Sequence, residues 1–161
     1  MSATPESAIA EAPLLLVDDS PEEMLLMQLG LKRAGVTLPQ VACGSGEEAL
    51  DFLLGRGSHA GRDMRQMPRL VLMDLHMPRM SGIDVLREIR AEPALDGLKV
   101  VIFSSSDEPN EIVEAHDVGA NSFICKPLTA IGMRDVIAQI RDRWLDVGLP
   151  APGASHATRD S

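Results

Sequence analysis

The sequence lacks any long hydrophobic run, and this absence limits where the protein can reside. No apolar segment approaches the roughly 20 consecutive residues that a membrane-spanning helix needs. The first residues, from Met1 to Pro13, lack both the basic start and the apolar stretch of a secretory signal. We therefore expect a cytoplasmic protein that does not enter a membrane.

Basic residues are scarce relative to acidic ones. The chain has 15 Lys and Arg residues against 24 Asp and Glu residues, which gives a formal net charge of −9. A protein that binds a nucleic-acid backbone needs a concentrated basic surface. The late residues Arg134, Arg141 and Arg143 are mixed with acidic residues and are typical of a solvated helix face. The charge balance thus argues against a nucleic-acid partner.

Cysteine is also scarce. Cys43 and Cys125 are the only two cysteines, and neither belongs to a CxxC pair or has a histidine at ligand spacing. Isolated cysteines of this kind are most often small buried residues. We predict two buried, reduced thiols.

Five short apolar runs alternate with five amphipathic segments, along a chain long enough for one domain. Continuous runs of this length are typical of strands that are buried on both faces of a parallel sheet. They cover residues 14–17, 40–42, 70–73, 100–103 and 122–125. Strict alternation of strand and helix predicts an α/β fold, a doubly wound five-stranded parallel sheet flanked by five helices.

Helix start signals follow the first two runs. Ser20, with Pro21 and Glu23 after it, has the pattern of a capping box, in which a serine and a glutamate satisfy each other's backbone N–H groups. Ser45 and Glu48 have the same spacing. We expect a helix to begin at each of these sites.

The remaining segments set the predicted domain limits. Thr129 begins a last helix that we expect to reach about residue 147, and the polar residues 55–68 predict an unusually long exposed loop. Beyond Leu149 the composition changes to Pro, Gly, Ala and Ser, which is typical of disorder. We expect a flexible N-terminus over residues 1–12, one domain over 13–148 and a disordered tail over 149–161.

Residues able to perform chemistry follow four of the apolar runs. They are Asp18, Asp19, Asp74, Ser104 and Lys126. The carboxyl ends of parallel strands meet at one edge of the sheet, where ligands bind in this fold class. Clustered carboxylates are tolerated around a hard divalent cation such as Mg²⁺. A lysine and a hydroxyl beside them can stabilise charge on a transferred phosphoryl group.

Each of these residues also has an ordinary structural interpretation. An aspartate after a strand often caps the next helix. Lys126-Pro127 is a common loop dipeptide, and Ser104 is one of three adjacent serines. What favours a site is that all the required residue types occur together at the ends of the right strands.

The sequence resembles response-regulator receiver domains from about Leu14 to Leu145. The matching stretches are LLLVDDS, LVLMDLHMPRMSG, VVIFSSS and FICKP, and their order and spacing are specific even though each motif alone is modest. The resemblance implies a flavodoxin-like receiver fold with strand order 2-1-3-4-5. It also implies that Asp74 is the phosphoacceptor and Mg²⁺ the cofactor. Asp19 would bind the metal directly, Asp18 through water or hydrogen bonds, and His76 through its backbone carbonyl.

The same resemblance assigns roles around the phosphoryl group. Ser104 would move inward to bind a phosphoryl oxygen, and Lys126 would pair with the phosphoryl group. The peptide bond before Pro127 is usually cis in this family. Phe123 occupies the position of an aromatic switch, where it lacks the hydroxyl of the tyrosine often found there.

Two further positions tune the phosphoryl lifetime in this family, His76 and Ser106. Neither supplies a carboxamide or carboxylate that could orient an attacking water. We infer a phosphoryl group that persists.

A narrower resemblance is to the small regulators paired with phytochrome-type sensor kinases. It rests on the long loop before the third strand, the SSSDEP segment and the end RDRWLDVGL. Members of that group often form inverted homodimers. The last helix carries apolar residues at helical spacing that suit a core face. Ile140 and Trp144 are our candidates for a dimer interface, because Trp144 is the only tryptophan in a chain with 2 % aromatic residues.

Three other functions occur on similar residues or similar folds. A haloacid-dehalogenase-type phosphohydrolase expects an aspartate two residues after the nucleophile, where this chain has His76. A nucleotide- or flavin-binding module expects a GxGxxG or Walker pattern, and Gly44-Ser45-Gly46 is the only glycine-rich turn near a strand end. A phosphorylation-independent adaptor stays open. The favoured reading is a single-domain regulator, not an enzyme, with a histidine kinase or phosphotransfer domain as donor and an unknown downstream protein as target.

Overall fold

The apolar runs form one parallel sheet. In this computed structural model, which describes residues 12–145, the strands are β1 (Leu14–Val17), β2 (Gln40–Cys43), β3 (Leu70–Met73), β4 (Val100–Ser104) and β5 (Ser122–Cys125). Their order is β2-β1-β3-β4-β5, and every neighbouring pair is parallel. The predicted sheet and strand order are confirmed. The N-terminal segment and the tail predicted over 149–161 lie outside the described residues, apart from residue 12.

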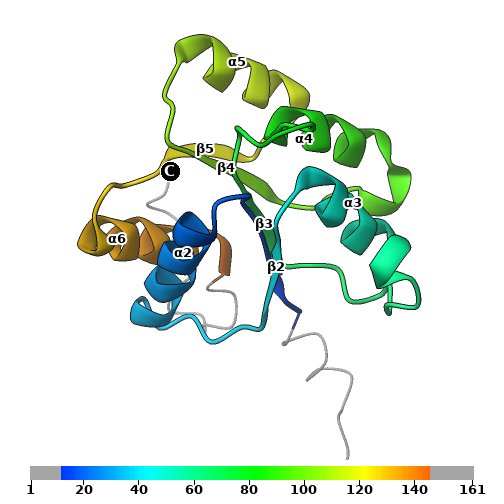
Figure 1. The fold of residues 1–161 in the computed structure, drawn as a ribbon, viewed down its shortest axis with the longest axis horizontal. Coiled ribbons are helices and arrows are strands. Elements are labelled where there is room, and N and C mark those ends of the chain that lie inside the picture. The colour runs from blue at the N-terminus through cyan, green and yellow to red at the C-terminus, as the bar shows by residue number, and fades with distance from the viewer. Residues whose placement is uncertain (1–11, 146–161) are drawn as a thin grey trace, which may run out of the picture.

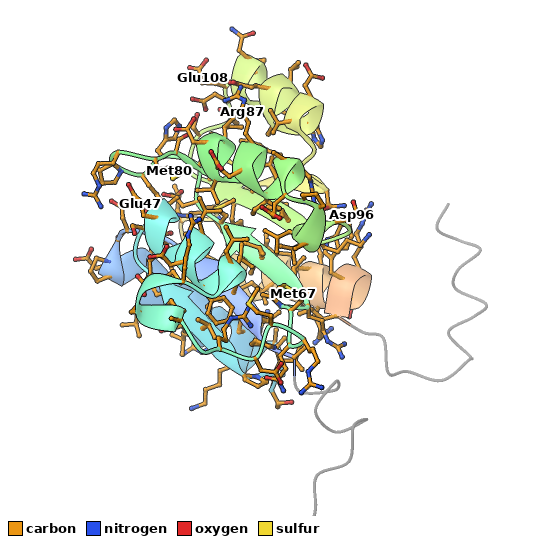
Figure 2. All side chains as sticks on the ribbon, turned by 90° about the vertical axis from the view of Figure 1, so that its right-hand side faces the viewer. Glu47, Met67, Met80, Arg87, Asp96 and Glu108 are labelled. Atoms are coloured by element: carbon orange, nitrogen blue, oxygen red, sulfur yellow. The ribbon has the colours of Figure 1, made fainter. Side chains whose placement is uncertain are left out.

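Five helices cover the two faces of the sheet (Figure 1). The helices α2 and α6 lie on one face, and α3, α4 and α5 lie on the other. Their bounds are α2 (Pro21–Arg33), α3 (Gly46–Leu54), α4 (Gly82–Ala91), α5 (Pro109–Val118) and α6 (Ala130–Ile140). Two short 3-10 turns, η1 (Gly57–His59) and η2 (Pro93–Leu95), interrupt the connections. Figure 2 shows the face covered by α3, α4 and α5, with Glu47 on α3, Arg87 on α4 and Glu108 at the start of α5.

Alternation along the strands builds two cores. Leu14 and Leu16 face α2 and α6, whereas Leu15 and Val17 face the other helices. All residues of β1, β3 and β4 are buried. Burying a side chain such as leucine stabilises the fold by roughly 1.5–3 kcal/mol. The sheet therefore fixes the positions at which these strands end.

Helix starts follow the predicted signals in part. The side chains of Ser20, Ser45 and Thr129 each accept a backbone N–H of the following helix. In the two predicted capping boxes, the glutamate side chains do not accept the backbone N–H of the serine. Glu23 binds Lys126, and Glu48 accepts the Gly44 N–H. The last helix is α-helical only to Ile140 and continues as a π-helical turn, η3 (Arg141–Leu145); the rest of its predicted length lies outside the described residues.

The long segment 55–68 folds back on α3. The guanidinium of Arg62 lies 4.1 Å from the ring centroid of Phe52. Its Nε donates to the Phe52 carbonyl at 2.7 Å, and its Nη1 donates to the Gln66 carbonyl at 2.9 Å. The segment is therefore anchored by one arginine, although most of its residues are exposed.

No helix within residues 12–145 has the length and apolar character needed to cross a membrane.

Candidate functional site

Asp74 directly follows β3 at the carboxyl edge of the sheet. Its backbone N–H donates to the Val17 carbonyl of β1 at 2.8 Å, which extends the ladder by one residue and fixes the backbone. Its side chain is buried. Asp74 thus presents one carboxylate at a fixed position between two strand ends.

Lys126 crosses to this carboxylate from the end of β5. Its backbone N–H donates to the Ser104 carbonyl at 2.7 Å, and its Nζ lies 3.1 Å from Asp74 Oδ1 and 2.6 Å from Asp18 Oδ2. Nζ also binds Oε1 of Glu23. One buried ammonium therefore contacts three carboxylates.

Glu23 is a site residue that the sequence analysis missed. The capping pattern predicted that its side chain would accept the Ser20 N–H, but that N–H donates to Asp18 Oδ1 at 3.0 Å. Glu23 is left to bind Lys126. A glutamate in the first turn of the helix after β1 lies above the same sheet edge, which is the signal that could have identified it.

The carboxylates form a group suited to a cation. One oxygen each from Asp18, Glu23 and Asp74 lies within 4.8 Å of the others. Hard divalent cations take carboxylate oxygens, so this donor set fits Mg²⁺ or Mn²⁺. Asp19, predicted to bind metal directly, is exposed and lies outside this group.

The electrostatics are dominated by burial. Burial raises the pKa of Asp74 to about 6, with Lys126 opposing the shift and the Asp18 carboxylate adding to it. Burial also raises the pKa of Asp18 above its ordinary value, against the hydrogen bond from Lys126. Burial alone lowers the pKa of Lys126, but its hydrogen bonds to Asp18 and Glu23, together with the negative charges of Asp74 and Asp18, outweigh burial and raise it. The lysine is therefore charged, but one ammonium shared among three carboxylates does not offset the cost of burying negative charge on Asp74.

Comparison with known proteins identifies the family. The model of the response regulator receiver domain matches residues 14–138. The chain belongs to this family.

Relatives of the receiver domain agree with this assignment. FilR2 of Methanothrix harundinacea, a probable methanogenesis regulatory protein, is 31% identical over 138 residues, which are 84% of this chain and 86% of that protein. The crystal structure of phosphorylated RcpA, a cyanobacterial phytochrome response regulator, has a TM-score of 0.77 and 28% identity, covering 88% of this chain and 99% of RcpA. The Mn²⁺-bound form of response regulator Rcp1 has a TM-score of 0.76 and 28% identity, covering 87% and 99%.

Neither Ser104 nor Phe123 belongs to the group of side chains that Lys126 joins to Asp74. Ser104 ends β4 and is fully buried, and its Oγ accepts the Ser106 N–H at 3.1 Å. Phe123 lies in β5, where it is half-buried and packs against the core on the α3–α5 face. Because the Ser104 oxygen accepts this bond, its O–H hydrogen is left to donate to a group on Asp74.

The two predicted lifetime positions converge on Glu111 of α5. His76 Nε2 lies 3.2 Å from Glu111 Oε2, and Ser106 Oγ donates to Glu111 Oε1 at 2.9 Å. No local sequence pattern identifies Glu111, because its position relative to His76 depends on how α5 packs. The structure thus places a carboxylate beside both lifetime positions.

The prediction of a cis bond before Pro127 is wrong. None of the peptide bonds in the described residues is cis, so Lys126-Pro127 is trans. Trans is the lower-energy isomer for an X–Pro bond, by about 0.5–1 kcal/mol.

Two predictions about exposure are also wrong. Ile140, a candidate interface residue, is 1% exposed and belongs to the core beneath α2 and α6. Cys125, predicted to be buried, is exposed because it ends the edge strand β5. Trp144 is half-buried; it packs against the same core, and the Arg143 guanidinium lies 5.1 Å from its ring centroid.

Proposed function

We propose that this receiver domain is a phosphorelay switch that accepts a phosphoryl group on Asp74. The donor is a sensor histidine kinase or a phosphotransfer domain. The observation that carries the proposal is the buried Asp74 carboxylate with Lys126 Nζ 3.1 Å away and two further carboxylates beside it. RcpA, which shares this fold, has been solved in its phosphorylated form.

The acidic group suits Mg²⁺ as cofactor. We assign Asp18, Asp19, Asp74 and the backbone carbonyl of His76 to its coordination shell, and Asp19, which lies outside the carboxylate group, would have to turn toward the cation. Glu23 lies close enough to Asp18 and Asp74 to join them. When bound, the cation neutralises negative charge on the carboxylates and on an incoming phosphoryl group. The Mn²⁺-bound form of Rcp1 supports a divalent cation in this fold.

The residues divide the work of phosphoryl transfer. An Asp74 carboxylate oxygen forms a bond to phosphorus, and the bond from phosphorus to the donor's histidine nitrogen breaks. Lys126 then pairs with the transferred group. Ser104 moves inward and donates its O–H to a phosphoryl oxygen, and Phe123 moves with it. The protein catalyses only its own phosphorylation and dephosphorylation.

The signal is a change in shape that a downstream protein reads. We infer a phytochrome-type kinase as the donor, from the likeness to RcpA. We also propose a cytoplasmic location, a homodimer that involves the Trp144 region, and no nucleic-acid partner. Size-exclusion chromatography of wild type and Trp144→Ala, with and without phosphodonor, tests the homodimer.

A persisting phosphoryl group is proposed from the residues around His76 and Ser106. Both side chains bind Glu111, which leaves that carboxylate engaged rather than free to orient an attacking water. The half-life of the phosphorylated form, compared between wild type and Glu111→Ala, measures this directly.

Intact mass spectrometry tests the phosphoacceptor. The protein is incubated with Mg²⁺ and a small-molecule phosphodonor, and Asp74→Asn is treated identically. We expect one labile phosphoryl adduct on wild type and none on the variant or without divalent cation. Asp19→Asn should raise the Mg²⁺ concentration that adduct formation requires, without removing the acceptor. An adduct that persists on Asp74→Asn would overturn the assignment.

A further inference from the structure

A second group of metal-ligating side chains lies on the α3 side of the sheet. It consists of Cys43, Glu48 and His59, whose Sγ, carboxylate oxygen and ring nitrogen lie within 4.8 Å of one another. Cys43 ends β2, Glu48 is in the first turn of α3, and His59 ends η1. The group shares no residue with the acidic pocket.

His59 brings an unpaired nitrogen to this group. Its Nε2 is buried and has no hydrogen-bond partner. Glu48 Oε2 lies 3.9 Å away, too far for a hydrogen bond. The ring is held edge-on to Phe52, with centroids 5.2 Å apart and an interplanar angle of 88°. Leaving a buried polar atom unpaired costs roughly 1–3 kcal/mol. A ligand that bonds to this nitrogen would remove that cost.

Glu48 is oriented by its surroundings. Its Oε1 accepts the Gly44 N–H at 2.9 Å, which leaves Oε2 on the side of His59. A carboxylate that is fixed by a second hydrogen bond is characteristic of metal ligands. The segment that carries His59 is likewise held, because Arg62 donates to carbonyls of α3.

We propose that Cys43, Glu48 and His59 bind a zinc ion, with water as the fourth ligand. A thiolate, an imidazole and a carboxylate are the three ligand types that zinc accepts, and three protein ligands plus water is a common arrangement. Bond lengths of about 2.0–2.3 Å place tetrahedral ligand atoms roughly 3.3–3.8 Å apart. Atoms that lie up to 4.8 Å apart must therefore move together by about 1–1.5 Å at most, which rotation of the Glu48 and His59 side chains can supply.

The charge balance favours a soft divalent metal over Mg²⁺. On binding, the Cys43 S–H bond loses its proton to solvent and the sulfur lone pair forms the bond to zinc. Burial raises the pKa of Cys43 to about 12, with the Glu48 charge adding to it, so the thiol stays protonated until metal binds. Mg²⁺ prefers oxygen ligands and binds thiolate weakly, so it would not offset the cost of ionising the thiol.

Such an ion would link β2, α3 and η1 through one centre, in addition to the hydrogen bonds that Arg62 already makes to α3. It would fix the 55–68 segment to the end of β2 and to α3. The Cys43 carbonyl accepts the Asp18 N–H at 3.1 Å, so the ion would lie one strand away from the acidic pocket.

Cobalt titration of the full chain tests the proposal, because Co²⁺ replaces zinc and gives a near-ultraviolet charge-transfer band only with thiolate. Excess Mg²⁺ keeps the acidic pocket occupied. We expect one Co²⁺ per chain with a thiolate band that zinc removes. The band should disappear in Cys43→Ala, and the affinity should fall by more than roughly 100-fold in His59→Gln. Cys125→Ser and His116→Gln, which change an exposed cysteine and an exposed histidine, should leave both unchanged.

Three outcomes would overturn the site. One is a wild-type protein that binds Co²⁺ without a thiolate band. The second is a band that survives in Cys43→Ala or is lost in Cys125→Ser. The third is full affinity in His59→Gln, which decides the question even where Cys43→Ala fails to fold, since His59 is in a surface turn.

Discussion

Gly82 lies directly against the backbone of Asp74. A Cβ atom on Gly82 would come within 2.4 Å of the Asp74 carbonyl oxygen and 3.1 Å of the Leu75 Cα. The Gly82 N–H donates to the Leu75 carbonyl at 2.8 Å. The first turn of α4 thus packs on the peptide that carries the proposed phosphoacceptor, and this spacing admits no side chain.

Replacing Gly82 by alanine should therefore disturb stability and phosphorylation together. Because the atoms it would meet are backbone, they can move only by displacing Asp74. We expect Gly82→Ala to lower the free energy of unfolding by about 1–3 kcal/mol and to slow adduct formation with a phosphodonor. Gly44→Ala is the matched control, since a Cβ there meets nothing within 4 Å. Equal urea midpoints for the two variants would contradict the close approach.

Asp74→Asn should stabilise the protein near neutral pH in the absence of divalent cation. The pKa of Asp74 is about 6 in the folded state, above its ordinary value of 3.8. Between these pH values the folded protein keeps a proton that the unfolded chain releases, so stability falls as the pH rises through this window. Asparagine removes this cost, which is about 3 kcal/mol at most for a shift of roughly two units.

Urea unfolding of wild type and Asp74→Asn at pH 4 and pH 7, in chelator, measures this effect. The difference between the proteins should be largest at pH 7 and small at pH 4. Asp19→Asn, which changes an exposed carboxylate, is the control. Saturating Mg²⁺ should stabilise wild type more than Asp74→Asn. A wild type that is more stable than Asp74→Asn at pH 7 in chelator would be evidence against the buried charge.

Much of the site follows from the sequence because topology places it. Asp18, Asp74 and Lys126 each follow a strand, and parallel strands bring their carboxyl ends to one edge whatever the details of packing. Glu23 was missed because its local pattern satisfied a capping rule, and only the fold shows that Asp18 takes the N–H in question.

Contacts that depend on loop closure are not encoded in local spacing. Cys43 and His59 have no motif in common, and the fold of residues 55–68 brings them together. Ile140 has the spacing of either a core or an interface residue, and burial under α2 decides between the two. The strands could be predicted because the signal is local: a short continuous apolar run is typical of a strand that is buried on both faces.

Arg90 should be among the most sensitive residues outside the acidic pocket. Its guanidinium donates to the Leu98 carbonyl at 2.7 Å, to the Gly119 carbonyl at 2.9 Å and to Asn121 Oδ1 at 3.0 Å. Asn121 Oδ1 also accepts the Val100 N–H at 2.8 Å. Removing the donors leaves the Leu98 and Gly119 carbonyls without this partner, at a cost of roughly 1–3 kcal/mol for each buried group, whereas Asn121 Oδ1 keeps the Val100 N–H.

We expect Arg90→Met to lower the free energy of unfolding by about 2–4 kcal/mol. Arg87→Met is the control on the same helix, since Arg87 forms an exposed ion pair with Glu114 at 2.7 Å. Such pairs contribute about 0.2–1 kcal/mol. Thermal and urea unfolding of both variants test the difference. A loss of under about 1 kcal/mol for Arg90→Met would mean that water replaces the guanidinium.

Lys126→Gln should destabilise the protein in a manner that depends on pH. Its ammonium contacts Asp18, Glu23 and Asp74, and removing one partner of a buried ion pair costs about 3–5 kcal/mol. At pH 7 the carboxylates then lose their balancing charge, so the loss should be large. Toward pH 4 the buried carboxylates take up protons, because their pKa values rise further without the lysine, and the loss should shrink. Lys32→Gln, at the exposed end of α2, controls for the change in net charge. A loss for Lys126→Gln that is the same at both pH values would show that the lysine acts through packing of its aliphatic chain rather than through its charge.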